Sequence, residues 1–264
     1  MKEWERFLGR KNFFITKENV AQASEKNAEW IQDYLDHAGT NIVYLGMSGG
    51  IDCTTVALQC LAAKVDLRLV LMPYKNNMYE SGSCERSMTL IEEFNFPRYQ
   101  VIDIAPQVDL TIEAIFQESK TDERREMLIA YLAPIVRMQT LYGLAWQNRG
   151  LVIGTGNLAE RLMGYFNKTG DGLCDLNPLG MFLKREVRLV ANYRRAPQGI
   201  ILAPPSADLK KGQIDEIDLK VTYDQIDDFV TYDTSGDSFA DAVIIETMRK
   251  NAHKHFKPMF NEIC

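Results

Sequence analysis

Short apolar runs alternate with helix-like segments through the first half of the chain. Ile42 to Met47 is a mostly apolar run, and the segment from Asp52 to Lys64 repeats apolar residues at helical spacing. The same patterns predict further strands at 67–72, 100–104 and 150–153, and helices at 17–38, 84–94 and 122–148. Buried strands that alternate with helices indicate an α/β fold, in which a parallel sheet carries helices on both faces.

The second half of the chain changes character after about residue 160. Residues 165–182 and 203–218 are rich in Gly, Pro, Asp and Lys without a clear period, and helices are predicted at 183–195, 223–230 and 237–251. Long irregular segments in compact proteins usually serve function. We expect a single domain over 1–264, with the sheet at about 40–160 and substrate loops with C-terminal helices at about 161–264.

Composition narrows the function classes. The chain has 264 residues and a net charge of −6, which argues against a nucleic-acid partner because such a protein needs a basic stripe to follow phosphates. No run approaches the roughly 18 apolar residues of a membrane helix, and the N-terminus lacks the apolar stretch of a signal peptide. We expect a cytoplasmic protein that uses neither a membrane nor a nucleic acid.

The cysteines favour a reducing compartment rather than a structural metal. No two of the five form a C-x-x-C pair, and the chain has only three histidines, so a structural zinc site is disfavoured.

A glycine-rich turn between the first strand and its helix is the sharpest local signal. Gly49 and Gly50 let the backbone approach an anion closely, and the helix that follows offers unpaired N–H groups. Asp52 would repel a phosphate unless a metal lies between them, and Mg²⁺ would resolve that conflict. The alternative is a plain strand–turn–helix junction in which Asp52 favours the helix N-terminus.

The turn fits neither of two common nucleotide-binding motifs. It lacks the Lys-Ser/Thr pair of the Walker A motif and the spacing of G-x-G-x-x-G. This shifts the hypothesis from kinases and dehydrogenases toward enzymes that release pyrophosphate. Residues 47–52 resemble the SGGxDS loop of the ATP pyrophosphatase (PP-loop) superfamily, whose fold is the Rossmann-like adenine-nucleotide α-hydrolase fold. Cys53 stands where that loop has its final serine.

Five further motifs in the second half narrow the resemblance. They are GTGNLAE at 154–160, GYFNKTGDG at 164–172, DLNPLG at 175–180, PPSADL at 204–209 and GQIDE at 212–216. In this order they are similar to the pattern of the ammonia-dependent NAD synthetases, and the similarity runs from about residue 41 to 255.

The resemblance implies a role for individual residues. It implies ATP contacts by Met47, Ser48, Gly49, Gly50, Ile51, Asp52, Cys53, Thr155, Lys184 and Ser206. It implies contacts to the substrate deamido-NAD by Arg137, Lys168, Asp175, His253 and Lys254, and Mg²⁺ ligands at Asp52 and Glu160. Without the resemblance, Glu160 reads as a solvated helix residue and the lysines read as surface charges.

Several positions depart from the family pattern. Ile135 replaces the first arginine of an RxRM segment, Leu173 and Lys220 replace glycines, and His255 and Phe256 stand where basic residues are usual. Most of these positions fall around the expected dinucleotide site, so they bear on substrate identity more than on chemistry.

The resemblance also implies a two-step amidation. The nicotinate carboxylate of deamido-NAD is adenylated by ATP with loss of pyrophosphate, and ammonia then displaces AMP. About 40 residues precede the first strand, too few for the domain that supplies ammonia in glutamine-dependent relatives. The family is homodimeric, and the predicted helix 122–148 is a candidate for the interface.

Two other interpretations stay open. Ile135, Leu173 and His255 motivate an amide ligase that acts on a different carboxylate. Cys53 motivates a catalytically silent nucleotide-binding protein.

Overall fold

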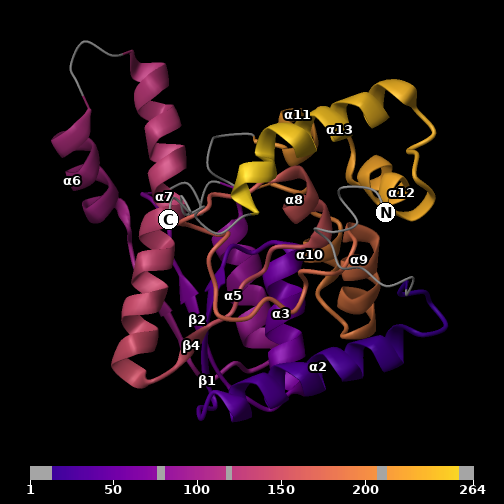
Figure 1. Ribbon diagram of the computed structural model, residues 1–264. Helices are drawn as coiled ribbons and strands as arrows, with labels where there is room; N and C mark the ends of the chain where they lie inside the picture. Colours follow the sequence, from indigo (N-terminus) through magenta and orange to yellow (C-terminus); the bar gives the residue numbers. More distant parts are fainter. Residues whose placement is uncertain (1–13, 76–80, 117–120, 207–212, 256–264) are drawn as a thin grey trace, which may run out of the picture.

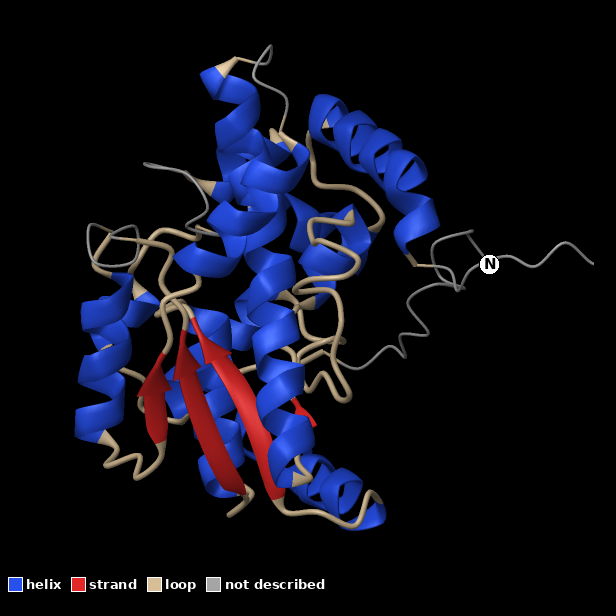
Figure 2. Cartoon of the chain, turned by 90° about the vertical axis from the view of Figure 1, so that its left-hand side faces the viewer, coloured by secondary structure: helices blue, strands red, loops and turns tan. Residues whose placement is uncertain are grey.

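Four parallel strands form the centre of the molecule, in the order β3-β2-β1-β4. The structure is a computed structural model that describes residues 14–75, 81–116, 121–206 and 213–255. The strands are β1 (Ile42–Met47), β2 (Asp66–Leu71), β3 (Tyr99–Val101) and β4 (Leu151–Val152). They run in one direction, so their carboxyl ends meet at one edge of the sheet (Figure 2). The predicted α/β class is confirmed.

Side chains of β1, β2 and β4 alternate between two cores. Val43 and Leu45 face the core formed with α2, α3, α5, α9 and α10, whereas Tyr44 and Val70 face the core formed with α6 and α7. Figure 1 shows α6 and α7 on one side of the sheet and α3 and α5 on the other. These helices span Val20–His37 (α2), Ile51–Ala62 (α3), Ser83–Glu93 (α5), Ala105–Ile115 (α6), Asp122–Asn148 (α7), Lys184–Tyr193 (α9) and Gln198–Ile201 (α10).

A third core lies beyond the sheet edge, in the part of the chain predicted to carry the substrate loops. It joins α8 (Leu158–Met163), α12 (Tyr223–Tyr232) and α13 (Ser238–Asn251) through buried Leu158, Tyr223 and Ile244. The short helices α11 (Asp215–Leu219) and η1 (Ala252–Lys254) complete this part of the described chain. The division of the chain at about residue 160 stays a prediction.

Helix α7 is the longest element in the described residues, at 27 residues. By length and apolarity alone it could cross a membrane, but a third of its most apolar window is buried. Leu132, Val136 and Leu141 on its buried face pack with Tyr44 of β1. The helix therefore occupies the position of a core helix against the sheet.

Two predicted segments differ in the structure. The third strand ends at Val101 rather than at residue 104, because α6 begins at Ala105, although the backbone N–H groups of Ile102 and Ile104 still donate to Leu71 and Pro73. The segment 203–218 was expected to be irregular, yet α11 begins at Asp215. Lys220 ends that helix at φ +61°, a left-handed conformation that explains why glycine suits this position.

Candidate active site

The glycine-rich turn is held against the start of α5. Met47 ends β1, and Gly49 adopts φ +71° before α3 begins at Ile51. A Cβ atom on Gly49 would lie 2.2 Å from the backbone oxygen of Ser83. Only glycine therefore fits, both for its positive φ and for this close approach. The turn opens the N-terminus of α3, as the sequence predicted for an anion site.

Cys53 lies inside this turn. Its side chain is buried, its thiol donates to the carbonyl of Gly50 at 3.2 Å, and Ser48 Oγ lies 3.4 Å from its sulfur. The thiol thus helps to shape the loop from within.

Two carboxylates and one ammonium meet beside the turn. Lys184 Nζ lies 2.5 Å from Asp52 Oδ2 and 3.7 Å from Glu160 Oε1, with only 3% of the lysine side chain exposed. Burial alone would lower the pKa of Lys184, but the charges of Asp52 and Glu160 outweigh it and raise that pKa. The surface-charge interpretation of this lysine is therefore wrong.

Asn157 fixes the two carboxylates relative to each other. Its side-chain amide donates to Asp52 Oδ1 and its backbone N–H donates to Glu160 Oε2, each at 3.0 Å. Asn157 and Glu160 also form the capping box of α8. Burial, and after it the nearby charge of Asp52, raises the pKa of Glu160. Glu160 is thus a partly buried member of the cluster and not a solvated helix residue.

Tyr223 packs against the group formed by Asp52, Glu160 and Lys184. It is fully buried, and its ring centre lies 4.7 Å from Lys184 Nζ, a cation–π distance. Its hydroxyl lies 3.2 Å from Asp215 Oδ2 and 3.4 Å from Glu160 Oε1. The hydroxyl has one proton and can donate it to only one of these two oxygens at a time. Asp215 is a third carboxylate near the lysine, and its charge also raises the pKa of Lys184.

Asp227 sets the position of Lys184 from a distance in sequence. The carboxylate, from α12, accepts the backbone N–H groups of Lys184 at 3.2 Å and Arg185 at 2.8 Å. These are the first two residues of α9, so Asp227 binds the positive end of that helix. Burial raises the pKa of Asp227 to about 6.

A cavity of about 750 Å³ opens over this cluster. The predicted residues that line it are Met47, Ser48, Gly50, Ile51, Asp52, Cys53, Arg137, Thr155, Glu160, Lys184 and Ser206. Gly49 lies behind the lining, where its carbonyl accepts a hydrogen bond from Arg86. The cavity also includes Arg86, Arg188 and Asp215, none of which the sequence had singled out as a site residue.

Four predicted substrate residues lie outside this lining. Lys254 Nζ donates to the carbonyls of Gly164 and Phe166 at 2.6 and 2.9 Å, and Lys168 Nζ lies 3.5 Å from the carbonyl of His253. The C-terminal end of the described chain is thereby tied to the glycine-rich segment 164–172.

Asp175, the fourth of these residues, lies beside Val152, the last residue of β4. Its carboxylate accepts the backbone N–H of Val152 at 2.7 Å and lies 3.3 Å from the hydroxyl of Tyr142.

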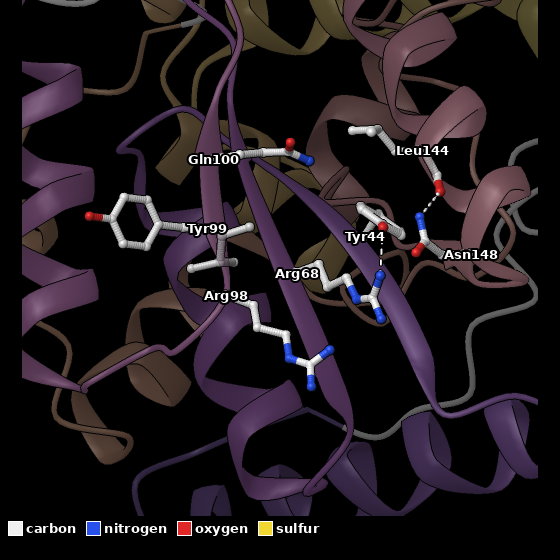
Figure 3. A pocket seen from close by; sticks show the side chains of 8 residues that line it. Tyr44, Arg68, Arg98, Tyr99, Gln100, Leu144 and Asn148 are labelled. Carbon is white, nitrogen blue, oxygen red and sulfur yellow. Dashed lines mark hydrogen bonds between the residues drawn. The ribbon is translucent and has the colours of Figure 1, made fainter.

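A second, smaller cavity of about 310 Å³ lies on the face of the sheet toward α7 (Figure 3). Arg68 Nη1 donates to Tyr44 OH at 3.0 Å, and Arg68 and Arg98 both pair with Asp66. None of the residues predicted for the site lines this cavity. The chemistry-bearing residues converge on the larger one.

The family model described as NAD synthase matches residues 23–259. The chain belongs to the NAD synthase family. It is 31% identical to an NH(3)-dependent NAD(+) synthetase of Ectopseudomonas mendocina over 249 residues, which covers 89% of each chain.

Solved structures of similar proteins agree with this assignment. The NMN synthetase of Francisella tularensis matches with a TM-score of 0.85 and 29% identity, over 92% of this chain and 99% of that one. An NH3-dependent NAD synthetase of Campylobacter jejuni matches with a TM-score of 0.74 at the same identity and coverage. The predicted family and fold are confirmed.

Proposed function

We propose that this chain converts the nicotinate carboxylate of deamido-NAD into its amide with ATP and ammonia, and releases AMP and pyrophosphate. The observation that carries the proposal is the meeting of Asp52, Glu160 and Lys184 beside a glycine-rich phosphate loop, within one large cavity. Membership of the NAD synthase family and the names of the relatives support it.

The reaction needs no general acid or base in its first step. A carboxylate oxygen attacks the α-phosphorus of ATP, and the bond to the leaving pyrophosphate breaks. Ammonia then attacks the acyl carbon of the adenylate, the bond to AMP breaks, and the amine loses its proton. Such chemistry relies on positioning and on stabilisation of phosphate charge, which matches a site rich in loop N–H groups and cations.

The residues of the loop would hold the phosphates. Residues 47–53 present the open N-terminus of α3, and Lys184 offers a buried ammonium beside it. Thr155 and Ser206, which line the same cavity, would contact the nucleotide.

We propose that Asp52 and Glu160 share a Mg²⁺ ion with ATP. The donor set fits, because carboxylate oxygens suit Mg²⁺ and the two acidic groups face only one ammonium. Within the described residues no three His, Cys, Asp or Glu side chains form a closed metal cage, so substrate phosphates would complete the coordination. When bound, the ion would neutralise part of the phosphate charge. Asp52→Asn and Glu160→Gln should each remove the Mg²⁺ dependence of ATP binding, measured by calorimetry.

The dinucleotide would lie beyond the loop. Arg137 lines the cavity and donates from Nε to the carbonyl of Met72 at 3.0 Å. Lys168, Asp175, His253 and Lys254 lie outside the lining and are proposed as contacts to the more distant part of the substrate.

A second substrate deserves a direct comparison. The match to the NMN synthetase, at a TM-score of 0.85, favours nicotinate mononucleotide as an alternative carboxylate. Ile135 and Leu173 depart from the family pattern near the expected dinucleotide site. The chemistry at the α-phosphate would be identical, and only the recognition of the substrate tail would differ.

One experiment tests both candidates. Purified protein is incubated with Mg-ATP, ammonium and either deamido-NAD or nicotinate mononucleotide, and the amide and AMP are quantified. A higher kcat/KM for deamido-NAD supports the leading proposal, and a higher value for the mononucleotide replaces it. Absence of AMP with both carboxylates would reject amidation of either. Glutamine in place of ammonium should give little product.

We also propose that the chain forms a homodimer through α7. Met127 and Tyr131 lie one turn apart on this helix and are both exposed, and neighbouring exposed apolar side chains are typical of interaction surfaces. Trp146, 84% exposed, adds a large apolar side chain near the other end of the helix. Light scattering should give twice the mass of the chain, and Trp146→Glu should shift the protein toward monomer. A monomeric wild-type protein would contradict the proposal.

A further inference from the structure

Arg86 ties the phosphate loop to the start of α5. Its Nε donates to the carbonyl of Gly49 at 3.0 Å, its Nη1 to the carbonyl of Ser81 at 3.1 Å, and its Nη2 to Ser83 Oγ at 3.0 Å. A guanidinium has five N–H donors. Two of the five have no acceptor among the described residues and remain for a ligand, and Arg86 lines the large cavity.

The charge of Arg86 is the least compensated among the cations of that cavity. Lys184 faces Asp52 and Glu160, and Arg188 pairs with Asp224 at 3.5 Å. Arg137 interacts with the charge of Asp171. In contrast, every hydrogen bond that Arg86 makes to a described residue ends on an uncharged oxygen.

A guanidinium that no carboxylate of the described residues pairs with, beside a phosphate loop, favours a polyphosphate ligand. The two remaining donors lie on different nitrogens, and such a fork can bind two phosphate oxygens at once. The α-phosphorus of ATP must stay open to the attacking carboxylate. The terminal phosphates are therefore the part of ATP that the loop and its neighbours can enclose.

We infer that Arg86 binds the β- and γ-phosphates of ATP and holds the pyrophosphate leaving group beside Gly49. This rests on the proposed function for its chemical meaning, but the binding itself can be measured without turnover. Arg86 would contact the substrate directly and would also keep the loop in place.

The test compares inorganic pyrophosphate with AMP as ligands, by calorimetry in the presence of Mg²⁺. Arg86→Gln should weaken pyrophosphate binding about tenfold or more, as expected for lost hydrogen bonds to a charged group. AMP, which lacks the terminal phosphates, should bind within about twofold of wild type. Arg98→Gln, an arginine variant in the smaller cavity, is the matched control and should change neither.

Two results would overturn the inference. One is a pyrophosphate affinity of Arg86→Gln within about twofold of wild type. The other is an equal loss for AMP and pyrophosphate, which would reduce Arg86 to a support of the loop. If circular dichroism shows that the glutamine variant does not fold, Arg86→Lys is judged by the same comparison, since it keeps the charge and loses the fork. A wild type that binds pyrophosphate through Arg86 but forms no amide would reject the proposed function alone.

Discussion

The side-chain amide of Asn157 donates a hydrogen bond to Asp52 Oδ1 at 3.0 Å, across 105 positions of sequence. The same side chain caps α8, because its oxygen accepts the N–H of Glu160 at 3.0 Å. One residue thus starts a helix and orients a carboxylate that comes from a different helix, α3. Helix capping and metal-site geometry are therefore coupled at this position.

This coupling predicts different outcomes for two changes. Asn157→Asp keeps a capping oxygen, but it loses the donor to Asp52 and places a second carboxyl group against it in a fully buried position. ATP turnover should therefore fall at least about tenfold, and stability should fall as well. Thr121→Ala removes the cap of α7 instead, in a helical turn that carries none of the proposed site residues. It should lower the free energy of unfolding by about 1 kcal/mol and leave kcat/KM for ATP unchanged. Equal activity losses in the two variants would contradict the coupling.

Gly39 provides a control for a substitution at Gly49 in the phosphate loop. Both have φ +71°, but a Cβ on Gly49 would overlap the Ser83 carbonyl, and one on Gly39 would meet no atom within 4 Å. Gly39→Ala should cost about 1 kcal/mol of stability from backbone strain alone. Gly49→Ala should add loss of ATP binding, measured by calorimetry. If Gly49→Ala binds ATP normally, the close approach to α5 is not required.

Asp227 predicts a pH dependence of stability. Burial raises its pKa from 3.8 to about 6 in the folded protein, so the folded state holds this proton more tightly than the unfolded state. Its contribution to stability is therefore present at low pH and is lost as pH rises from about 4 to 6, up to roughly 3 kcal/mol. In denaturant titrations, the free energy of unfolding of the wild type minus that of Asp227→Asn should rise as pH falls from 7 to 4.5. If this difference falls on acidification, the carboxyl is ionised more readily in the folded protein than in the unfolded one.

Cys53 should shape the loop without carrying chemistry. Its thiol donates to the Gly50 carbonyl at 3.2 Å, and a serine hydroxyl can make the same bond. Cys53→Ser should retain activity, with ATP affinity changed by at most about 1 kcal/mol. Alkylation of Cys53 should inhibit, because an added group would fill the loop, and bound ATP should slow it. A folded but inactive Cys53→Ser variant would reveal a chemical role for the sulfur.

The sequence predicted those parts of the site that residues adjacent in the chain determine. The apolar run from Ile42 to Met47 and the glycines directly after it predict a strand followed by a loop, so the loop and its position at the sheet edge followed from the pattern alone. The roles of Glu160 and Lys184 came from the motif series, and their proximity emerges only in the structure.

Arg86 and Asp227 were missed for a shared physical reason. Each lies on a helix whose polar residues look like a solvated face, and each acts by reaching a backbone group 37 or more positions away. The periodicity of apolar residues along the chain does not predict a contact between residues so far apart in the sequence. Helix α6 was also missed, although Pro106 at its second position is a usual helix start. The departures at Ile135 and Leu173 were visible in the sequence, but only a substrate comparison can give them meaning.

The dependence of Lys184 on Asp227 has a consequence for the newborn chain. On the ribosome, the phosphate loop emerges well before α9, and α9 emerges before the helix that anchors its first turn. A chain without α12 lacks the carboxylate that binds the backbone N–H groups of Lys184 and Arg185, so we expect the Lys184 ammonium not to be held beside Asp52 and Glu160. A nascent or truncated chain that ends before residue 227 should therefore contain the phosphate loop but should not bind a nucleotide. We expect the pocket to form only after the C-terminal third of the chain has been synthesised.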